Sequence, residues 1–430
     1  MSHLARRELS DGVPMLRWMT VETASARPPV RSFASMVAAV ALFGCADSMT
    51  GSYLVLFASE EADLSPLRVG LFVSAVALGG ILVSTVFGRR FDRSPTRGWV
   101  VVAAVASAAG FALVPWVDGF WPLMLIGVTL LGAAGAGYPQ LFALADIAFE
   151  GAIKKRVAPL LRSGWSLAWA VGPLLGAWLL GVAGYSGLFR VAAVVLVLTM
   201  GVVALVPRAA DVASGPGLAN PSTSARSRPR GPVVLLTAAM VLVHTAMFAG
   251  SVALPLYVTA ELDRPSGDVG LIFSACAVVE IAAALLLVWV LPRVRLQQLV
   301  LAGLVLFIAY FVVAALAESL SAVLIAQLAR GAAIAVIGTA GMQLFQAVLA
   351  PASGTAAALF SNAATAGSLV SGVLAGALIQ LLGTRATLVS CGVLCVAACG
   401  AFWAANRLHR RAPDDPPSGG PSGDDRASQR

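Results

Sequence analysis

The stretch from Val69 to Ala75 reads Val-Gly-Leu-Phe-Val-Ser-Ala, and the stretch from Val269 to Ala275 reads Val-Gly-Leu-Ile-Phe-Ser-Ala. Three further matches lie at nearly the same offset of 200 residues: Gly51-Ser52 with Gly250-Ser251, Gln140-Leu141-Phe142 with Gln343-Leu344-Phe345, and Gly172-x-Leu174-x-Gly176-Ala177 with Gly372-x-Leu374-x-Gly376-Ala377. Matches that recur in the same order indicate that the two halves of the chain are copies of one structural unit.

The composition places these two copies in a membrane. Of the 430 residues, 59% are hydrophobic and 12% are charged, against roughly 25% charged residues in a typical soluble domain. Two groups of six apolar runs are each long enough for a helix of roughly 20 residues to cross a bilayer. The runs lie near 33–58, 67–87, 99–117, 122–147, 159–182, 187–206, 233–259, 269–291, 297–316, 320–346, 353–381 and 386–405. We therefore expect an all-α polytopic membrane protein with twelve transmembrane helices in two pseudo-symmetric six-helix bundles.

The polar segments divide the chain further. We expect a disordered cytoplasmic arm over 1–31, bundles over 32–206 and 232–405, a cytoplasmic linker over 207–231 and a disordered cytoplasmic tail over 406–430. A net charge of +8 would suggest nucleic-acid binding in a soluble protein. With both termini cytoplasmic, however, 23 of the 29 Lys and Arg residues fall in cytoplasmic segments. This asymmetry is typical of a membrane protein and predicts its orientation.

Several classes of chemistry have no support in the sequence. All five cysteines lie in apolar runs, without disulfide or metal-site spacing. The chain has no phosphate-binding loop of the Walker type, no Cys/His cluster and no nucleophile motif with a base. We therefore expect no enzyme activity, no metal, no cofactor and no coupling to ATP.

The loop after the second run reads Gly-Arg-Arg-Phe-Asp-Arg-Ser-Pro-Thr-Arg over residues 88–97. It resembles the signature loop of the major facilitator superfamily, Gly-x-x-x-Asp-Arg followed by basic residues. The resemblance implies that Gly88, Asp92 and Arg93 form a latch between the second and third helices that steadies one transport state. The alternative is an ordinary basic loop on the cytoplasmic side.

The fifth run contains Gly172-Pro173-Leu174-Leu175-Gly176. This stretch resembles a motif of the proton-coupled antiporters in the same superfamily. Pro173 removes one helical hydrogen bond and permits a bend, while Gly172 and Gly176 permit close packing of helices. The resemblance implies a gating role for these three residues.

A narrower resemblance covers most of the membrane part. It rests on several stretches: residues 139–145, Arg162 with 166–169, 255–257, Glu261-Leu262, Glu280-Ile281, Gly341-Met342, Phe345-Gln346 and 359–362. These are similar to the bacterial sugar efflux transporters. The resemblance implies proton-driven export of small saccharides or glycosides by a monomer in the bacterial inner membrane, with no nucleic acid or protein partner. Asp47, Asp146, His244 and Arg330 depart from that family's pattern. A multidrug or metabolite proton antiporter of the same fold is the alternative, followed by a membrane enzyme or receptor.

Ionisable residues inside the predicted helices are candidates for proton coupling, because each costs at least ~2.5 kcal/mol near the bilayer centre. Glu280, Arg330 and His244 lie near mid-depth of their runs. Burial favours the neutral form of a carboxyl group and a nearby arginine favours the charged form. A Glu280 that alternates its contact with Arg330 would load and release a proton. A static buried ion pair is the alternative, and His244 is either a second titrating group or a satisfied core residue.

Sugars need flat apolar surfaces for their C–H faces and amides or carboxylates for their hydroxyl groups. Arg162, Trp165 and Trp169 share one helical face. We predict a substrate-binding set that adds one carboxylate and four amides to this face: Asp47, Gln140, Gln343, Gln346 and Asn362. Asp146, near the cytoplasmic end of its helix, is expected to form a gate or a structural pair with Arg162.

Overall fold

A computed structural model describes residues 30–149, 151–206 and 230–411. Most of the predicted N-terminal arm, linker and tail lies outside these ranges. The described residues form helices and no strand, and eleven helical segments among them are long and apolar enough to cross a membrane. The all-α prediction is therefore confirmed.

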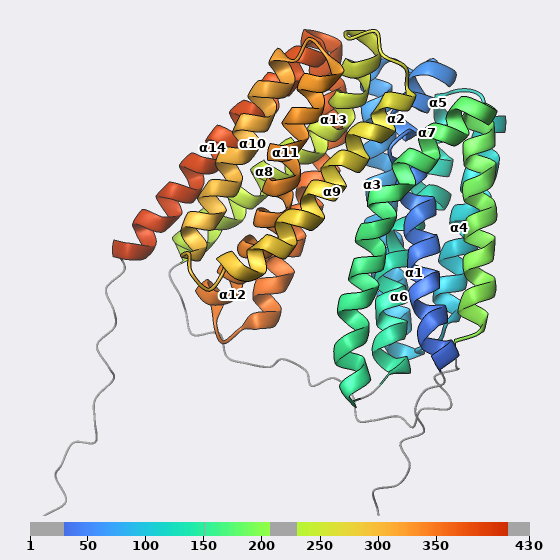
Figure 1. The fold of residues 1–430 in the computed structure, drawn as a ribbon, viewed down its shortest axis with the longest axis horizontal. Helices are drawn as coiled ribbons and strands as arrows, with labels where there is room; N and C mark the ends of the chain where they lie inside the picture. Colours follow the sequence, from blue (N-terminus) through green and yellow to red (C-terminus); the bar gives the residue numbers. More distant parts are fainter. Residues whose placement is uncertain (1–29, 150, 207–229, 412–430) are drawn as a thin grey trace, which may run out of the picture.

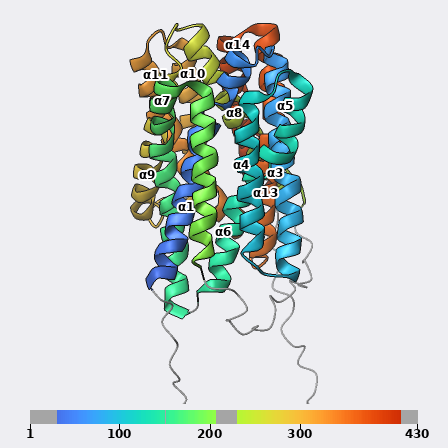
Figure 2. The same cartoon turned by 90° about the vertical axis from the view of Figure 1, so that its right-hand side faces the viewer.

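The N-terminal half is drawn in blue to green in Figure 1. Its helical segments are α1 (Val30–Gly51), α2 (Leu54–Leu56), η2 (Phe57–Glu61), α3 (Pro66–Arg93), α4 (Gly98–Leu113), η3 (Val114–Trp116), α5 (Phe120–Ile126), η4 (Gly127–Leu131), α6 (Ala134–Ala148) and α7 (Gly151–Ala204). The short segments η2 and η4 are π-helical. Segment η2 continues α2 to the end of the first crossing, and η4 lies between α5 and α6 within a single crossing. The helices of this half run nearly parallel to one another (Figure 2).

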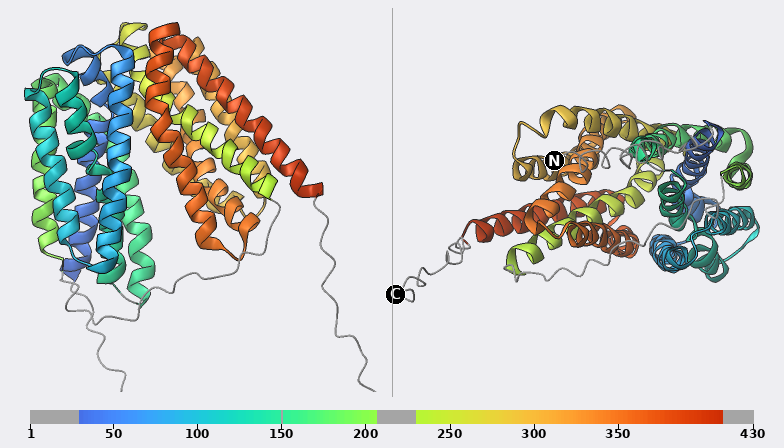
Figure 3. Two further views of the ribbon diagram at one scale, coloured as in Figure 1. Left: turned by 180° about the vertical axis from the view of Figure 1, so that it is seen from behind. Right: turned by 90° about the horizontal axis from the view of Figure 1, so that it is seen from below.

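The C-terminal half repeats this arrangement. Its segments are α8 (Arg230–Ala260), α9 (Gly267–Val290), α10 (Leu296–Leu316), α11 (Leu320–Val336), η6 (Ile337–Gly341), α12 (Met342–Leu349), α13 (Ser353–Leu382) and α14 (Thr384–Arg411). The last helix continues to Arg411, six residues beyond the expected end at 405. Seen from behind and from below, the two halves lie side by side (Figure 3).

Helix α7 accounts for the difference between eleven segments and the twelve predicted crossings. At ~1.5 Å per residue its 54 residues would span about 80 Å, far more than a hydrocarbon core of ~30 Å. The backbone leaves the helical region at Gly184, with φ 65° and ψ −173°. This left-handed φ suits glycine, which has no Cβ to clash. Gly184 therefore divides α7 into two crossings, within the turn predicted at 184–187.

The ends of the described segments lie on one side of the molecule. Helix α1 begins, α7 ends, α8 begins and α14 ends at the lower side of Figure 1. An even number of crossings in each half produces this arrangement. The two halves meet at the upper side and diverge toward the lower side (Figure 1).

The repeated sequence motifs form the contact between the halves. Helix α3 packs against α13, and α7 packs against α9. A Cβ added to Gly70 would lie 2.2 Å from the carbonyl oxygen of Gly372, and one added to Gly270 would lie 2.3 Å from that of Pro173. Small residues allow such close backbone approach between membrane helices. The matched glycines are thus among the positions at which the two bundles touch.

One equivalent pair of serines shows where the symmetry breaks. Ser74 Oγ donates to Leu369 O at 2.9 Å and accepts from Val373 N at 3.0 Å, so it connects the halves. Its counterpart, Ser274 Oγ, is buried and has no hydrogen-bond partner among the described residues. The residue 200 positions before Val373 is Pro173, which has no N–H to donate. The proline motif therefore removes a hydrogen bond from one of the two contacts.

Polar contacts close the upper side. Ser266 Oγ donates to both carboxylate oxygens of Glu60 at 3.0 Å, and Tyr185 OH donates to Oε2 of the same residue at 2.7 Å. Leu67 N donates to Gln380 Oε1 at 3.2 Å. Since Ser266 and Gln380 belong to the C-terminal half, these bonds hold the bundles together at one end.

Candidate functional site

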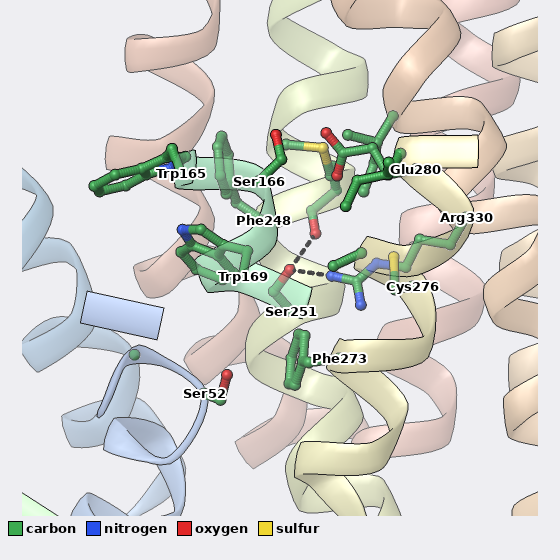
Figure 4. A pocket seen from close by; sticks show the side chains of 15 residues that line it. Ser52, Trp165, Ser166, Trp169, Phe248, Ser251, Phe273, Cys276, Glu280 and Arg330 are labelled. Carbon is green, nitrogen blue, oxygen red and sulfur yellow. Dashed lines mark hydrogen bonds between the residues drawn. The ribbon is translucent and has the colours of Figure 1, made fainter. Parts of the chain in front are cut away.

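A cavity of about 350 Å³ lies between the two halves. The N-terminal half lines it from α1 and α7, and the C-terminal half lines it from α8, α9 and α11. Trp165 and Trp169 stand on one side, while Glu280 and Arg330 stand on the other (Figure 4). We call this space the central cavity. The structure thus brings together four of the residues predicted from the sequence.

Arg330 is anchored within the C-terminal half. Its side chain is only 4% exposed. Nη2 donates to Ser251 Oγ at 2.6 Å and Nη1 donates to Gln327 Oε1 at 3.4 Å, as Figure 4 shows for Ser251. The guanidinium carbon also lies 5.1 Å from the ring centre of Phe273 and 5.6 Å from that of Tyr310. Cation–π contacts of this kind stabilise a desolvated positive charge.

Glu280 faces the same cavity and is half-buried. Among the described residues it makes no hydrogen bond and no ion pair, so the expected contact with Arg330 is not formed in this conformation. The positive charges of Arg330 and Arg162 both attract its carboxylate, and Arg162 is exposed and does not line the cavity. Arg162 belongs to the opposite half, a partnership that the sequence analysis did not identify.

A second cavity, of about 490 Å³, lies between α1, α3, α6 and α13. Asp47 and the hydroxyl residues Thr50, Ser84 and Thr365 line it. Gly51 lines both cavities, because α1 ends there and the helix resumes only at Leu54. Asp47 therefore faces a polar space beside the central cavity, separate from Glu280.

The four amide residues predicted to bind substrate lie outside both cavities. Gln140 is buried, and its Oε1 has no hydrogen-bond partner among the described residues. Gln343, Gln346 and Asn362 are exposed. In this conformation the polar lining instead comes from hydroxyl groups such as that of Ser251.

His244 is a buried residue of α8. Its Nδ1 lies 2.7 Å from Met240 O, a carbonyl that can only accept, so Nδ1 carries the proton and donates. The ring packs against Phe248 and Phe360, with ring centres 6.4 and 5.7 Å away. His244 lines neither cavity.

The predicted gating residues fall into two groups. Gly88, Asp92 and Arg93 lie in the last turns of α3, on the side where the halves diverge, and Asp146 is exposed near the end of α6. Asp92 makes no hydrogen bond or ion pair with any described residue, so the predicted latch is not engaged in this conformation.

Pro173, Gly172 and Gly176 form the second group and join α7 to α1. A Cβ on Gly172 would lie 1.9 Å from Ser48 Oγ, and one on Gly176 would lie 2.6 Å from the ring of Tyr53. Tyr53 OH donates to Pro173 O at 3.0 Å. This motif thus packs helices within the N-terminal half and, through Pro173, reaches α9 of the other half.

Sequence reasoning missed the aromatic residues Phe248 and Phe273, which also line the central cavity. Nothing in an apolar run separates a ring that faces a cavity from one that faces lipid. Ser251 could have been identified as a candidate from the sequence, because Gly250-Ser251 belongs to the repeat.

Comparisons with known proteins agree with this architecture. The family model described as Major Facilitator Superfamily matches residues 36–261 and 236–427. The chain is 34% identical over 376 residues to a "Putative sugar efflux transporter" of Deinococcus radiodurans, covering 86% of this chain and 97% of that protein. It is 27% identical over 374 residues to "Sugar efflux transporter A" of Escherichia coli K12, covering 85% and 94%.

Solved structures share the fold at low sequence identity. A crystal structure of the nucleoside transporter NupG superposes with a TM-score of 0.69 at 12% identity, covering 88% of this chain and 98% of that one. A bacterial homologue of the human lysosomal transporter Spinster, in an inward-facing and occupied conformation, gives a TM-score of 0.68 at 13% identity, covering 89% and 98%.

Proposed function

The chain belongs to the major facilitator superfamily, and we propose that it is a secondary transporter that exports small sugars or glycosides in exchange for protons. The observation that carries the substrate class is the 34% identity, over nearly the whole length of both chains, to a relative named as a sugar efflux transporter. The central cavity supports it, because tryptophan rings face ionisable and hydroxyl groups there. We expect a multi-pass protein of a bacterial inner membrane that acts as a monomer without a cofactor.

The orientation follows from the basic residues. The lower side of Figure 1 carries Arg89, Arg90 and Arg93 at the end of α3, and positive charge favours the cytoplasmic side. We propose that this side is cytoplasmic and that both termini lie there. The conformation described here is then open toward the cytoplasm, where an exporter collects its substrate.

Export requires the halves to close at the cytoplasmic side and open at the other. The close contacts at Gly70 and Gly270 belong to the conformation described here and must loosen when the outer side opens. The bonds from Ser266 to Glu60 and from Leu67 to Gln380 must break when the outer side opens. On the cytoplasmic side, closure would let the loop with Asp92 engage as a latch.

Proton coupling is assigned to Glu280. This carboxyl group faces the cavity without a hydrogen bond or an ion pair among the described residues, and it is attracted by one arginine from each half. A rocking motion changes the distance from Glu280 to Arg162, since they belong to opposite halves. Approach of Arg162 favours the ionised carboxylate and withdrawal favours the protonated form. Glu280 would thereby load a proton in one state and release it in the other.

The direct test of the substrate class is counterflow. Purified protein in liposomes preloaded with unlabelled lactose is supplied with a trace of labelled lactose outside, and with a labelled glucoside in a parallel series. Transient accumulation of label above that of protein-free liposomes is expected. Absence of counterflow for every sugar and glycoside tested, with the protein inserted, would reject the proposed substrate class.

Trp169→Ala is expected to raise the half-saturating sugar concentration roughly tenfold, because loss of an aromatic stacking surface costs about 1.4 kcal/mol. The matched control is Trp178→Ala, on the same helix. Trp178 is 63% exposed on the outside of the bundle and does not line the cavity. Initial rates of counterflow at increasing sugar concentration provide the measurement. Equal effects of the two substitutions would mean that Trp169 does not contact sugar.

A further inference from the structure

The central cavity holds a buried cation whose charge no described residue neutralises. Arg330 is 4% exposed, and no described carboxylate lies within ion-pair distance of it. Taking a guanidinium out of water costs several kcal/mol unless a partner compensates the charge. The neutral groups around Arg330 supply hydrogen bonds and ring faces but no negative charge.

The guanidinium also has unused hydrogen-bonding capacity. Arginine carries five N–H donors, and two of them are used, by Ser251 and Gln327. Three donors thus lack an acceptor among the described residues. Because Arg330 lines the cavity, and Ser251 and the aromatic rings hold its head group in place, these donors form a prepared site for an oxyanion.

Glu280 does not neutralise the charge of Arg330. Among the described residues it is the one acidic side chain that lines the central cavity, and it forms no ion pair with Arg330. Asp47 lines the neighbouring cavity and forms no ion pair with Arg330. Neither carboxylate lies within ion-pair distance of Arg330, so no described residue compensates the single positive charge of its guanidinium.

We propose that Arg330 binds the carboxylate of an acidic sugar, so that the substrates include glycosides of uronic acids. The inference rests on the proposed sugar transport and names a substrate class within it. A singly charged carboxylate matches the one uncompensated positive charge, and the planar guanidinium pairs with a carboxylate through two parallel hydrogen bonds. A doubly charged phosphate would leave a net negative charge beside Arg330.

The test is competition against counterflow of a labelled neutral glucoside by four unlabelled ligands of the same size class. These are phenyl β-D-glucuronide, its methyl ester, phenyl β-D-glucoside and the 6-phosphate of that glucoside. With the wild-type protein, the glucuronide is expected to compete roughly ten- to hundredfold more strongly than its neutral methyl ester, as a charge-assisted pair implies. Equal competition by the acid and the ester would overturn the proposal, as would stronger competition by the phosphate than by the glucuronide.

Substitutions then locate the effect. In Arg330→Gln, the concentrations of methyl ester and of glucuronide that halve counterflow are expected to be about equal. Arg330→Lys is expected to keep part of the preference for the glucuronide, because the charge stays while the paired donors are lost. Arg295→Gln removes an exposed arginine outside the cavity and should keep the wild-type preference. A wild-type preference in Arg330→Gln would overturn the assignment. The comparison of ligands on the wild-type protein decides the question even if this variant does not fold.

Failure of this inference differs from failure of the proposed function. If the neutral glucoside shows counterflow and the acid has no advantage, the protein transports sugars and Arg330 is not an anion site. If no sugar, neutral or acidic, supports counterflow, the proposed function itself fails.

Discussion

Glu280→Gln is expected to abolish the accumulation of sugar driven by a proton gradient while sugar exchange continues. Glutamine has nearly the same shape as a protonated glutamate and neither binds nor releases a proton. Because Glu280 faces the central cavity with no hydrogen bond to a described residue, the substitution breaks no observed bond. Exchange moves sugar in both directions without net proton movement, so it needs only the binding site and the rocking motion.

The measurement compares gradient-driven uptake with counterflow in the same vesicle preparation. Glu318→Gln is the matched control, since Glu318 is an exposed residue between α10 and α11 and is not a cavity residue. A Glu280→Gln protein that still accumulates sugar in response to the gradient would remove Glu280 from the coupling mechanism. Loss of both activities would assign it to sugar binding instead.

Gly70→Ala is expected to lower the rate of counterflow at least roughly tenfold. Its Cβ would lie 2.2 Å from the carbonyl oxygen of Gly372, a backbone atom that has little freedom to move. Overpacking of this kind costs about 1–3 kcal/mol, and here the cost falls on the conformation that is open toward the cytoplasm. The state that collects substrate would thus lose most of its population.

Gly181→Ala is the control for this substitution, because a Cβ at Gly181 would meet no atom within 4 Å. Both variants gain the same helix propensity, so a difference between them reports the contact between halves. The measurement is the initial rate of counterflow together with the size-exclusion profile of the purified proteins. Wild-type rates for Gly70→Ala would show that close approach at Gly70 is not needed for transport.

Much of the architecture followed from sequence. Apolar runs of membrane length mark the crossings, and the predicted turn at 184–187 contains the left-handed Gly184 that divides α7. The repeat extends to backbone detail, because Asp63 and Asp263 both have positive φ, at 48° and 50°. Aspartate tolerates this conformation better than most residues. These features depend on local chain chemistry, which a single sequence displays.

The candidate site was only partly predictable, because the rotation of each helix decides which polar residues reach a cavity. Trp165 and Trp169 line the central cavity, whereas Gln343 and Gln346 of α12 are exposed outside it. The contact between Glu280 and Arg330 was expected from their common depth. Depth fixes the position of a residue along a helix and leaves its distance across the cavity open, so the attraction from Arg162 was missed.

The most direct test of proton-driven sugar export is uptake of labelled lactose into inside-out membrane vesicles, with and without an imposed gradient that is acid inside. The account predicts accumulation that depends on the gradient and is abolished by an uncoupler, because export from the cell corresponds to uptake by such vesicles. If sugar uptake by the folded and inserted protein changes neither with the gradient nor with the uncoupler, proton-driven sugar export is contradicted.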